Sequence, residues 1–224
     1  MEAEGAIPSQ KETPTIVKSE IKDFYKKDVL SIIRKVLLEP VSGTYSLFEN
    51  RSEKSFNQSL ILMASAALVS MAFVFLIIPS QIRQYAPWFS MLVKSAFFTI
   101  VFLLLVSLVS FCIKLISGKA SFKNELLTGA LCAIPFTALI FLLFFFSKIM
   151  MDEQMISSLA YGGYSEIISK AGIFLVFVFY IVLLFINILL QSLRASGTKD
   201  ALAWYLSPIG IFLAFYLTIK IVFM

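Results

Sequence analysis

The chain has 224 residues, of which 59 % are hydrophobic and 15 % are charged, and its mean hydropathy is +0.88. This composition excludes a water-facing globular surface and indicates that lipid is the solvent of most of the chain. Histidine is absent and the formal net charge is +5, so the commonest neutral-pH general base and transition-metal ligand are missing.

The basic residues border the apolar segments. In a soluble protein a pI of about 9.1 would suggest nucleic acid as a partner, but next to membrane spans it favours anionic lipid headgroups. Cys112 and Cys132 both lie inside apolar segments, where a thiol behaves as a small hydrophobe. A structural disulfide is therefore not expected.

The N-terminal region divides into a tail, an amphipathic segment and a linker. Residues 1–15 are polar and contain two prolines, which predicts a disordered tail. Within residues 16–57, apolar residues recur at helical spacing, and lysines and arginines occupy most of the positions between them. The apolar residues are Ile21, Phe24, Tyr25, Val29, Ile32, Ile33 and Val36. This pattern predicts an amphipathic helix that ends before Pro40, followed by a linker with turn formers at Pro40, Ser42 and Gly43. The helix either packs on the protein's own bundle, or lies among the headgroups or docks a partner.

Residues 58–224 are predicted to form an all-α domain of five transmembrane helices. The expected spans are 59–79, 95–113, 126–146, 172–191 and 201–218. No charged residue lies near the centre of a span, and Lys114 falls in the second connector. Lys94 separates the second span from a further apolar run that begins at Trp88.

The distribution of lysine and arginine predicts the orientation. With the N-terminus in the cytoplasm, nine of the 19 lie on that side in residues 1–58, three in residues 114–123 and two in residues 194–199. The remaining five lie on the other side, so the positive-inside rule favours a cytoplasmic N-terminus and an extracytoplasmic C-terminus.

Polar residues inside the spans are few, and interhelical hydrogen bonds worth roughly 0.6 kcal/mol each are their ordinary role. They include Ser107, Ser110, Thr128, Thr137, Tyr180, Asn187 and Ser207. Asn187 and Gln191 stand one turn apart on the same helix face. The pair either lines a polar groove or fixes a helix contact.

Two spans contain a proline, Pro135 and Pro208. Each removes a backbone donor, which kinks a helix and exposes a carbonyl that a hydroxyl or water must satisfy. Gly129 with Ala133, and Ala203 with Ser207, have the small-xxx-small spacing of closely packed helices. Close packing and a hinge are both compatible with these features.

The sequence contains little that predicts catalysis or metal binding. The connector from Ser147 to Ala171 is expected to be a solvated loop, and its Asp152, Glu153 and Glu166 lack the spacing of a calcium site. No phosphate loop, nucleophile elbow or nucleotide fingerprint is present. We therefore expect no cofactor, no metal and no enzymatic activity, and a role for Asp152, Glu153 or Asp200 as catalytic acids is the weakest hypothesis.

The segments LLEPVSGTYSLF (37–48) and SGKASFKNELLTGALCAIPFTAL (117–139) resemble the Yip family of membrane proteins, the Ypt/Rab-interacting group with prokaryotic relatives. In that family a basic glycine turn and a Ser/Thr-Phe pair precede a span with a central proline. The matching positions are Gly118, Lys119, Ser121, Phe122 and Pro135. The resemblance covers about residues 28–220 and implies a membrane-organising, accessory or trafficking-type role without enzymatic activity. The acidic-leucine-tyrosine-glycine-proline signature of eukaryotic members is missing, so Rab binding is not implied.

The sequence is compatible with two functions. The first is a membrane-organising, accessory or trafficking-type role in a prokaryotic plasma membrane. Its expected partners are anionic headgroups at the basic N-terminal helix and other membrane proteins or a second copy of the chain, and no nucleic acid. The alternative is a small transporter, channel or lipid-moving protein. It would use a polar groove near Asn187 and Gln191, gated by kinks at Pro135 and Pro208.

Overall fold

A computed structural model shows that the chain is an all-α membrane protein. It describes residues 22, 24–50, 55–77, 87–116, 120–150 and 164–224. In these ranges the elements are η1 (Phe24–Asp28), α2 (Val29–Leu38), α3 (Ser42–Glu49), α4 (Ser55–Ile77), α6 (Trp88–Ile116), α7 (Phe122–Met150), α9 (Tyr164–Ala195) and α10 (Asp200–Phe223). The described residues include no strand, and α4, α6, α7, α9 and α10 are each long and apolar enough to cross a membrane.

The spanning helices extend beyond the apolar runs that predict them, because backbone hydrogen bonding continues past the edge of the hydrocarbon layer. Helix α6 is continuous from Trp88 and passes through Lys94, which is exposed. The expected loop is wrong for residues 147–150, which belong to α7, and for residues 164–171, because α9 begins at Tyr164. Glu166 thus belongs to the first turn of α9. Asp152 and Glu153, like the predicted tail, lie outside the described residues.

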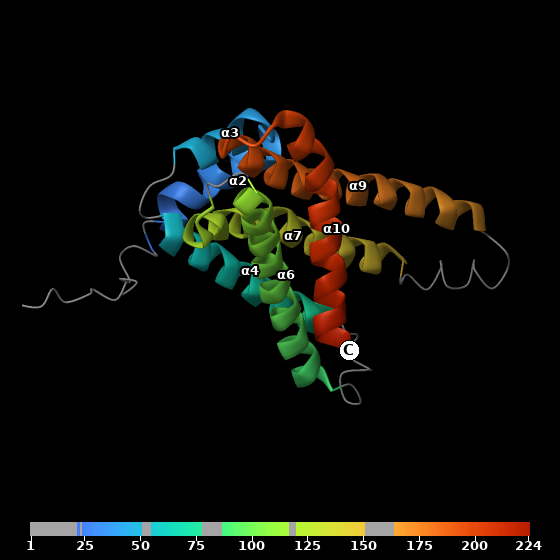
Figure 1. Ribbon diagram of the computed structural model, residues 1–224. Helices are drawn as coiled ribbons and strands as arrows, with labels where there is room; N and C mark the ends of the chain where they lie inside the picture. Colours follow the sequence, from blue (N-terminus) through green and yellow to red (C-terminus); the bar gives the residue numbers. More distant parts are fainter. Residues whose placement is uncertain (1–21, 23, 51–54, 78–86, 117–119, 151–163) are drawn as a thin grey trace, which may run out of the picture.

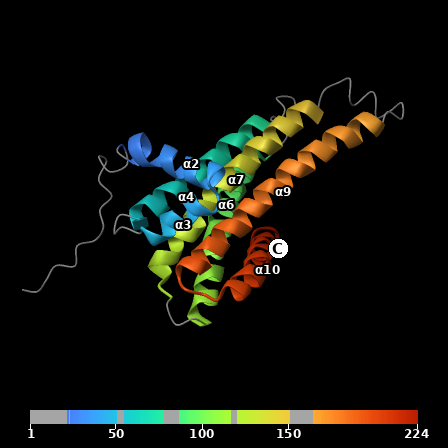
Figure 2. The ribbon, with the colours of Figure 1, turned by 90° about the horizontal axis from the view of Figure 1, so that it is seen from above.

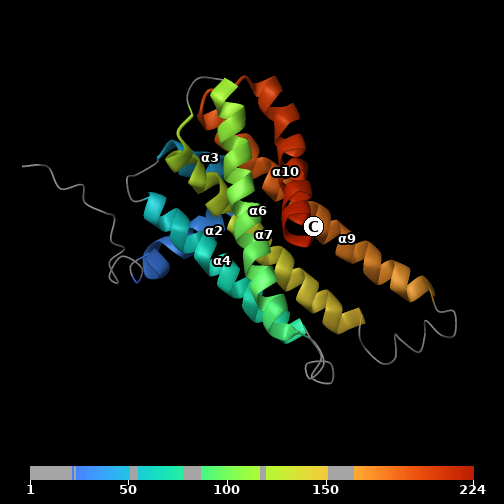
Figure 3. The same cartoon turned by 60° about the horizontal axis from the view of Figure 1, so that its bottom comes forward.

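The five long helices form two sets. Helices α4, α7 and α9 lie side by side, and α6 and α10 form a pair that crosses them (Figure 1, Figure 2). Helix α6 connects the two sets, since it packs against its partner α10 and also against α4 and α7. The N-terminal part of α9 extends beyond α10 (Figure 3), and the side chains of residues 171–180 in this helix are mostly exposed.

The centre of the bundle is aromatic. Phe102 of α6 is fully buried, and its ring centroid lies 5.6 Å from that of Phe136, 5.5 Å from Phe185 and 4.6 Å from Phe215. These partners belong to α7, α9 and α10. Offset and edge-to-face contacts of this kind fill space between helices with rigid groups, so one side chain joins four helices.

Small residues allow the helices to approach closely. A methyl group added at Gly129 of α7 would overlap the carbonyl oxygen of Leu103 and the hydroxyl of Ser107 on α6. Ala203 and Ser207 of α10 are likewise fully buried. Both small-xxx-small spacings therefore serve helix packing in the structure.

Both prolines lie inside helices that continue through them, Pro135 in α7 and Pro208 in α10. The hydroxyl of Ser207, next to Pro208, donates a hydrogen bond of 2.6 Å to the carbonyl of Ala203. The carbonyl that Pro208 deprives of its helical donor is that of Trp204, four residues earlier. Ser207 thus bonds the neighbouring carbonyl instead.

Elements η1, α2 and α3, here called the arm (Phe24–Glu49), fold back on the bundle. Phe24 and Val36 are buried, and Val29, Ile32 and Ile33 pack against the core. Most of the apolar face of the predicted amphipathic helix is thus covered by the protein's own bundle, although Tyr25 stays 48 % exposed and Ile21 lies outside the described residues.

The predicted linker is wrong for residues 42–49, which form α3. Gly43 lies in the first turn of this helix, where an added Cβ would lie 2.7 Å from the carbonyl oxygen of Lys35 on α2. The glycine therefore provides close packing between two short helices. The buried ring of Phe48 anchors α3 to the core.

Candidate functional site

Polar side chains gather at one end of the bundle, where α6 and α9 finish, α7 and α10 begin, and the arm covers the helices (Figure 1). We call this region the arm end. It contains a buried ion pair, a chain of amide hydrogen bonds and an open pocket. Gln191 and Ser192, neighbours in α9, connect these three features.

The buried ion pair joins Lys114 of α6 to Glu125 of α7. The Nζ–Oε2 distance is 2.6 Å, and the two side chains are 0 % and 2 % exposed. Ser110 donates a hydrogen bond of 2.7 Å to the same carboxylate oxygen, while Lys114 donates one of 2.8 Å to the hydroxyl of Ser192 on α9. Thr128 completes the polar cluster through a 2.6 Å hydrogen bond to Ser192.

The chemistry of this polar cluster suits a structural joint. Removing two charges from water is costly, and their attraction offsets that cost only when geometry is good and further hydrogen bonds are made. Here the hydroxyls of Ser110, Thr128 and Ser192 provide those bonds. Because the donors come from α6, α7 and α9, the cluster fixes how these helices meet at the arm end.

The sequence pattern alone did not predict this pair. Lys114 was assigned to the second connector and Glu125 stood just before the third span, yet the structure places both inside helices. Two signals were available. A short connector joins two opposite charges, and each charge has a hydroxyl residue about one turn deeper in the apolar run, Ser110 and Thr128.

The amide chain binds the arm to α9. Gln191 donates from Nε2 to Oδ1 of Asn187 at 3.0 Å, and Asn187 donates from Nδ2 to the carbonyl of Pro40. Tyr180 donates its hydroxyl to the carbonyl of Leu37 at 3.2 Å. The last carbonyls of a helix have no intrahelical donor, so α9 supplies side-chain donors where α2 ends.

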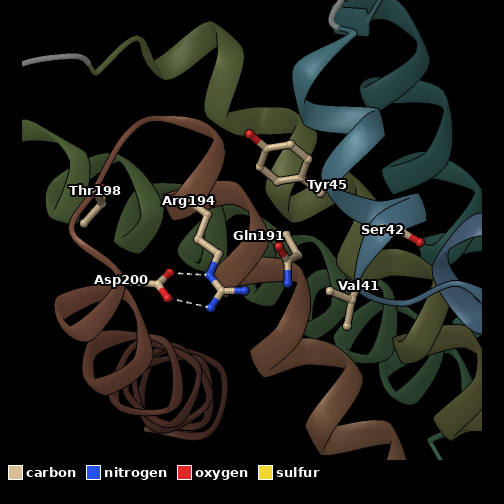
Figure 4. Close-up of a pocket in the computed structure, with 7 residues that line it drawn as sticks. All are labelled: Val41, Ser42, Tyr45, Gln191, Arg194, Thr198 and Asp200. Atoms are coloured by element: carbon tan, nitrogen blue, oxygen red, sulfur yellow. Dashed lines mark hydrogen bonds and ion pairs between the residues drawn. The ribbon is translucent and has the colours of Figure 1, made fainter.

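An open pocket of about 600 Å³ lies between the arm and the turn that joins α9 to α10 (Figure 4). It is lined by Val41, Ser42, Tyr45, Gln191, Arg194, Thr198 and Asp200. Arg194 donates from Nε and Nη2 to the two carboxylate oxygens of Asp200, at 2.6 Å and 3.0 Å. Gln191 and Thr198 are buried, whereas the arm residues are exposed. Of the predicted groove pair, Gln191 lines this pocket and Asn187 does not.

None of the described residues that carry the family resemblance lines the pocket, and Ser121 contacts Glu125 of the polar cluster through its backbone. Gly118 and Lys119 fall outside the described residues. Ser121 precedes α7, and its carbonyl accepts the backbone N–H of Glu125 at 3.1 Å. Phe122 is exposed and packs edge-on against Phe111, while Pro135 is buried in the middle of α7.

No protein-family model, curated protein or solved structure matches the chain. Within the described ranges, no group of three or more Cys, Asp or Glu side chains is placed to hold a metal ion. Five helices suited to crossing a membrane make the chain a polytopic membrane protein. Its more specific function has to be argued from the arm end.

Proposed function

We propose that this chain is a non-enzymatic membrane protein with a membrane-organising or accessory role, in which the docked arm is the working element. The observation that carries the proposal is the arrangement of the arm. Most of its apolar face is packed on the bundle, and Lys26 and Arg34 remain exposed, as does Lys22 just before the arm. These basic side chains are thereby held at a fixed place beside the ends of the spanning helices, on a surface that also exposes Glu39 and Glu49.

The chemistry of that surface favours anionic partners. Lysine and arginine beside a bilayer are each attracted to anionic headgroups by about 1 kcal/mol, and acidic proteins at the membrane surface offer the same complement. The excess of basic residues on the arm side supports a cytoplasmic arm. Together with the resemblance to the Yip family, this supports a scaffold or accessory subunit in a prokaryotic plasma membrane.

Charge reversal on the arm tests the proposal. The arm variant is Lys26→Glu with Arg34→Glu, and the matched control is Lys94→Glu with Lys220→Glu. All four side chains are exposed, and both variants change the net charge equally, but the control positions lie outside the arm, in α6 and α10.

Two readouts separate the arm from the control. In nanodiscs, cross-linking of the arm to phosphatidylglycerol should fall several-fold in the arm variant and stay unchanged in the control. In cells at equal expression, the arm variant alone should alter membrane morphology and the set of cross-linked membrane proteins. Equal behaviour of both variants in all readouts would rule out the arm as the working element.

One observation favours the alternative function. The amide chain from Asn187 to Gln191 leads to the open pocket, as a small transporter, channel or lipid-moving protein would require. Purified protein in liposomes tests it, with ions, small solutes or labelled lipid as cargo. The main proposal expects no flux above empty liposomes. A flux abolished by Asn187→Leu and slowed by Pro208→Ala would establish the alternative in its place.

A further inference from the structure

We propose that the pocket between the arm and the α9–α10 turn binds a phospholipid headgroup that carries both a phosphate and an ammonium group. Arg194 would bind the phosphate and Asp200 the ammonium. This inference rests on the pocket itself and goes beyond the proposed function, which depends on the exposed basic face of the arm.

The position of the pocket suits a lipid headgroup. Helix α9 ends at Ala195 and α10 begins at Asp200, and both helices are candidate membrane spans. Their shared turn therefore lies where hydrocarbon gives way to headgroups. Trp204 and Tyr205 follow one turn later and are 57 % and 73 % exposed. Exposed Trp and Tyr are typical of that interfacial layer.

The charges of the pocket suit a ligand with both signs. Arg194 and Asp200 both line the pocket, and their side chains are 27 % and 69 % exposed. Because the two charges cancel, the pair provides little long-range attraction for a purely anionic group. It does present a cation and an anion to one bound molecule, in a fixed relative orientation.

Free hydrogen-bonding capacity remains on both charged groups. Asp200 holds Nε and Nη2 of Arg194, and among the described residues Nη1 forms no hydrogen bond. Figure 4 shows the guanidinium extended between Asp200 and Gln191. An oriented guanidinium is well suited to phosphate oxygens. A carboxylate offers about four acceptor positions, so Asp200 retains positions for an ammonium group.

The remaining lining adds size and neutral polar groups. A volume of about 600 Å³ lies within the range of about 300–1,000 Å³ common for small-ligand sites. Gln191 and Thr198 are buried on the bundle side, while Ser42 and Tyr45 come from the arm. A headgroup in the pocket would therefore contact the arm and the bundle together.

Native mass spectrometry of the full-length protein in detergent tests the proposal. The probes are phosphatidylethanolamine, phosphatidylcholine and phosphatidylglycerol with identical acyl chains. Glycerophosphoethanolamine is a soluble competitor with the same headgroup. We expect phosphatidylethanolamine to bind tightest, because its primary ammonium can donate to Asp200, whereas choline has no N–H and glycerol has no charge.

Two substitutions assign the roles of the charged groups. Arg194→Gln should weaken phosphatidylethanolamine binding about tenfold, the loss expected for one charge-assisted hydrogen bond of about 1.4 kcal/mol. Asp200→Asn should remove the preference for phosphatidylethanolamine over phosphatidylglycerol, since the arginine charge is then uncompensated. Lys94→Gln in α6 and Glu49→Gln in the arm remove exposed charges outside the pocket and should change neither result.

Several outcomes would overturn the proposal. The first is equal affinity for all three lipids in the unaltered protein, and the second is unchanged affinity in Arg194→Gln. Tight binding of glycerophosphoethanolamine without acyl chains would overturn the assignment to lipid. A melting temperature close to that of the unaltered protein excludes misfolding of the variants, as expected for an exposed ion pair worth about 0–1 kcal/mol. Arg194→Lys keeps the charge, so its affinity for phosphatidylethanolamine provides a second check on the role of that charge.

Discussion

Helix α6 has two fully buried regions of opposite chemistry. In its middle, Phe102 contacts aromatic rings from α7, α9 and α10. Three turns later, Lys114 pairs with Glu125 of α7 and donates to Ser192 of α9. Both side chains are inaccessible to solvent, but the first makes only van der Waals and ring contacts and the second makes directed hydrogen bonds.

The contrast shows how the centre and one end of a membrane bundle can differ in how strictly they fix helix positions. Lipid tails are as apolar as phenylalanine, so the aromatic centre gains stability from close packing rather than from exclusion of water. Ring contacts also tolerate small shifts between helices. The polar cluster tolerates few such shifts, since displacement of one partner leaves a buried charge uncompensated. The arm therefore docks at the end whose helix positions are most tightly specified.

Breaking the ion pair should have the largest effect. Lys114→Met leaves Glu125 buried without its cation, which typically costs about 3–5 kcal/mol. The free energy of unfolding in mixed detergent micelles measures the loss. The double variant Lys114→Met with Glu125→Leu should recover most of it, because a pair of apolar residues needs no charge compensation. A double variant as unstable as the single one would show that the charges are not the cause.

Truncating the aromatic centre should have the second-largest effect on the free energy of unfolding. Phe102→Ala removes a ring that joins four helices, and buried Phe→Ala changes in soluble cores cost about 3–5 kcal/mol. We expect the lower end of that range, since the transfer of apolar surface contributes less in lipid. Phe177→Ala is the control, because this ring of α9 is 53 % exposed. Similar losses of unfolding free energy for both variants would contradict a packed aromatic centre.

Close helix approach gives a third and smaller effect. Gly129→Ala should cost about 1–3 kcal/mol, as overpacking usually does, because the added methyl would overlap the backbone carbonyl of Leu103. Gly172→Ala is the matched control, since no atom lies within 4 Å of its added Cβ. This change should raise stability by roughly 0.5–1 kcal/mol through helix propensity. Equal signs for the two changes would contradict the contact.

The sequence predicted the spans well and the arm end poorly, for a physical reason. Long apolar runs report burial in lipid directly, so all five spanning helices were found. The polar cluster depends on three helices that meet in space, whereas hydropathy places Lys114 in the connector after the second span. The linker prediction for residues 42–49 is wrong for the same reason. Gly43 indicates a turn in the sequence, but in the structure it allows close contact with the neighbouring helix α2. Tertiary contacts decide such positions.

The smallest expected effect concerns the hydrogen bond from Asn187 to the carbonyl of Pro40. Asn187→Leu should lower overall stability by only about 0.6 kcal/mol, the usual worth of a hydrogen bond between membrane helices. The loss of stability should be confined to the arm, because this hydrogen bond fixes the chain just after α2 and does not join two spanning helices. Backbone amides of α2 and α3 should then exchange hydrogen roughly threefold faster, while exchange in α6 stays unchanged.

Tyr180→Phe, which removes the hydroxyl that binds Leu37, provides an independent change with the same expected pattern. If exchange instead rises equally in α6, Asn187 stabilises the bundle rather than the docked arm. If only the arm loosens, binding of phosphatidylethanolamine should weaken with it, since Ser42 and Tyr45 line the pocket from the arm. Headgroup binding and arm docking would then be two readouts of one equilibrium, each favouring the other to the same extent.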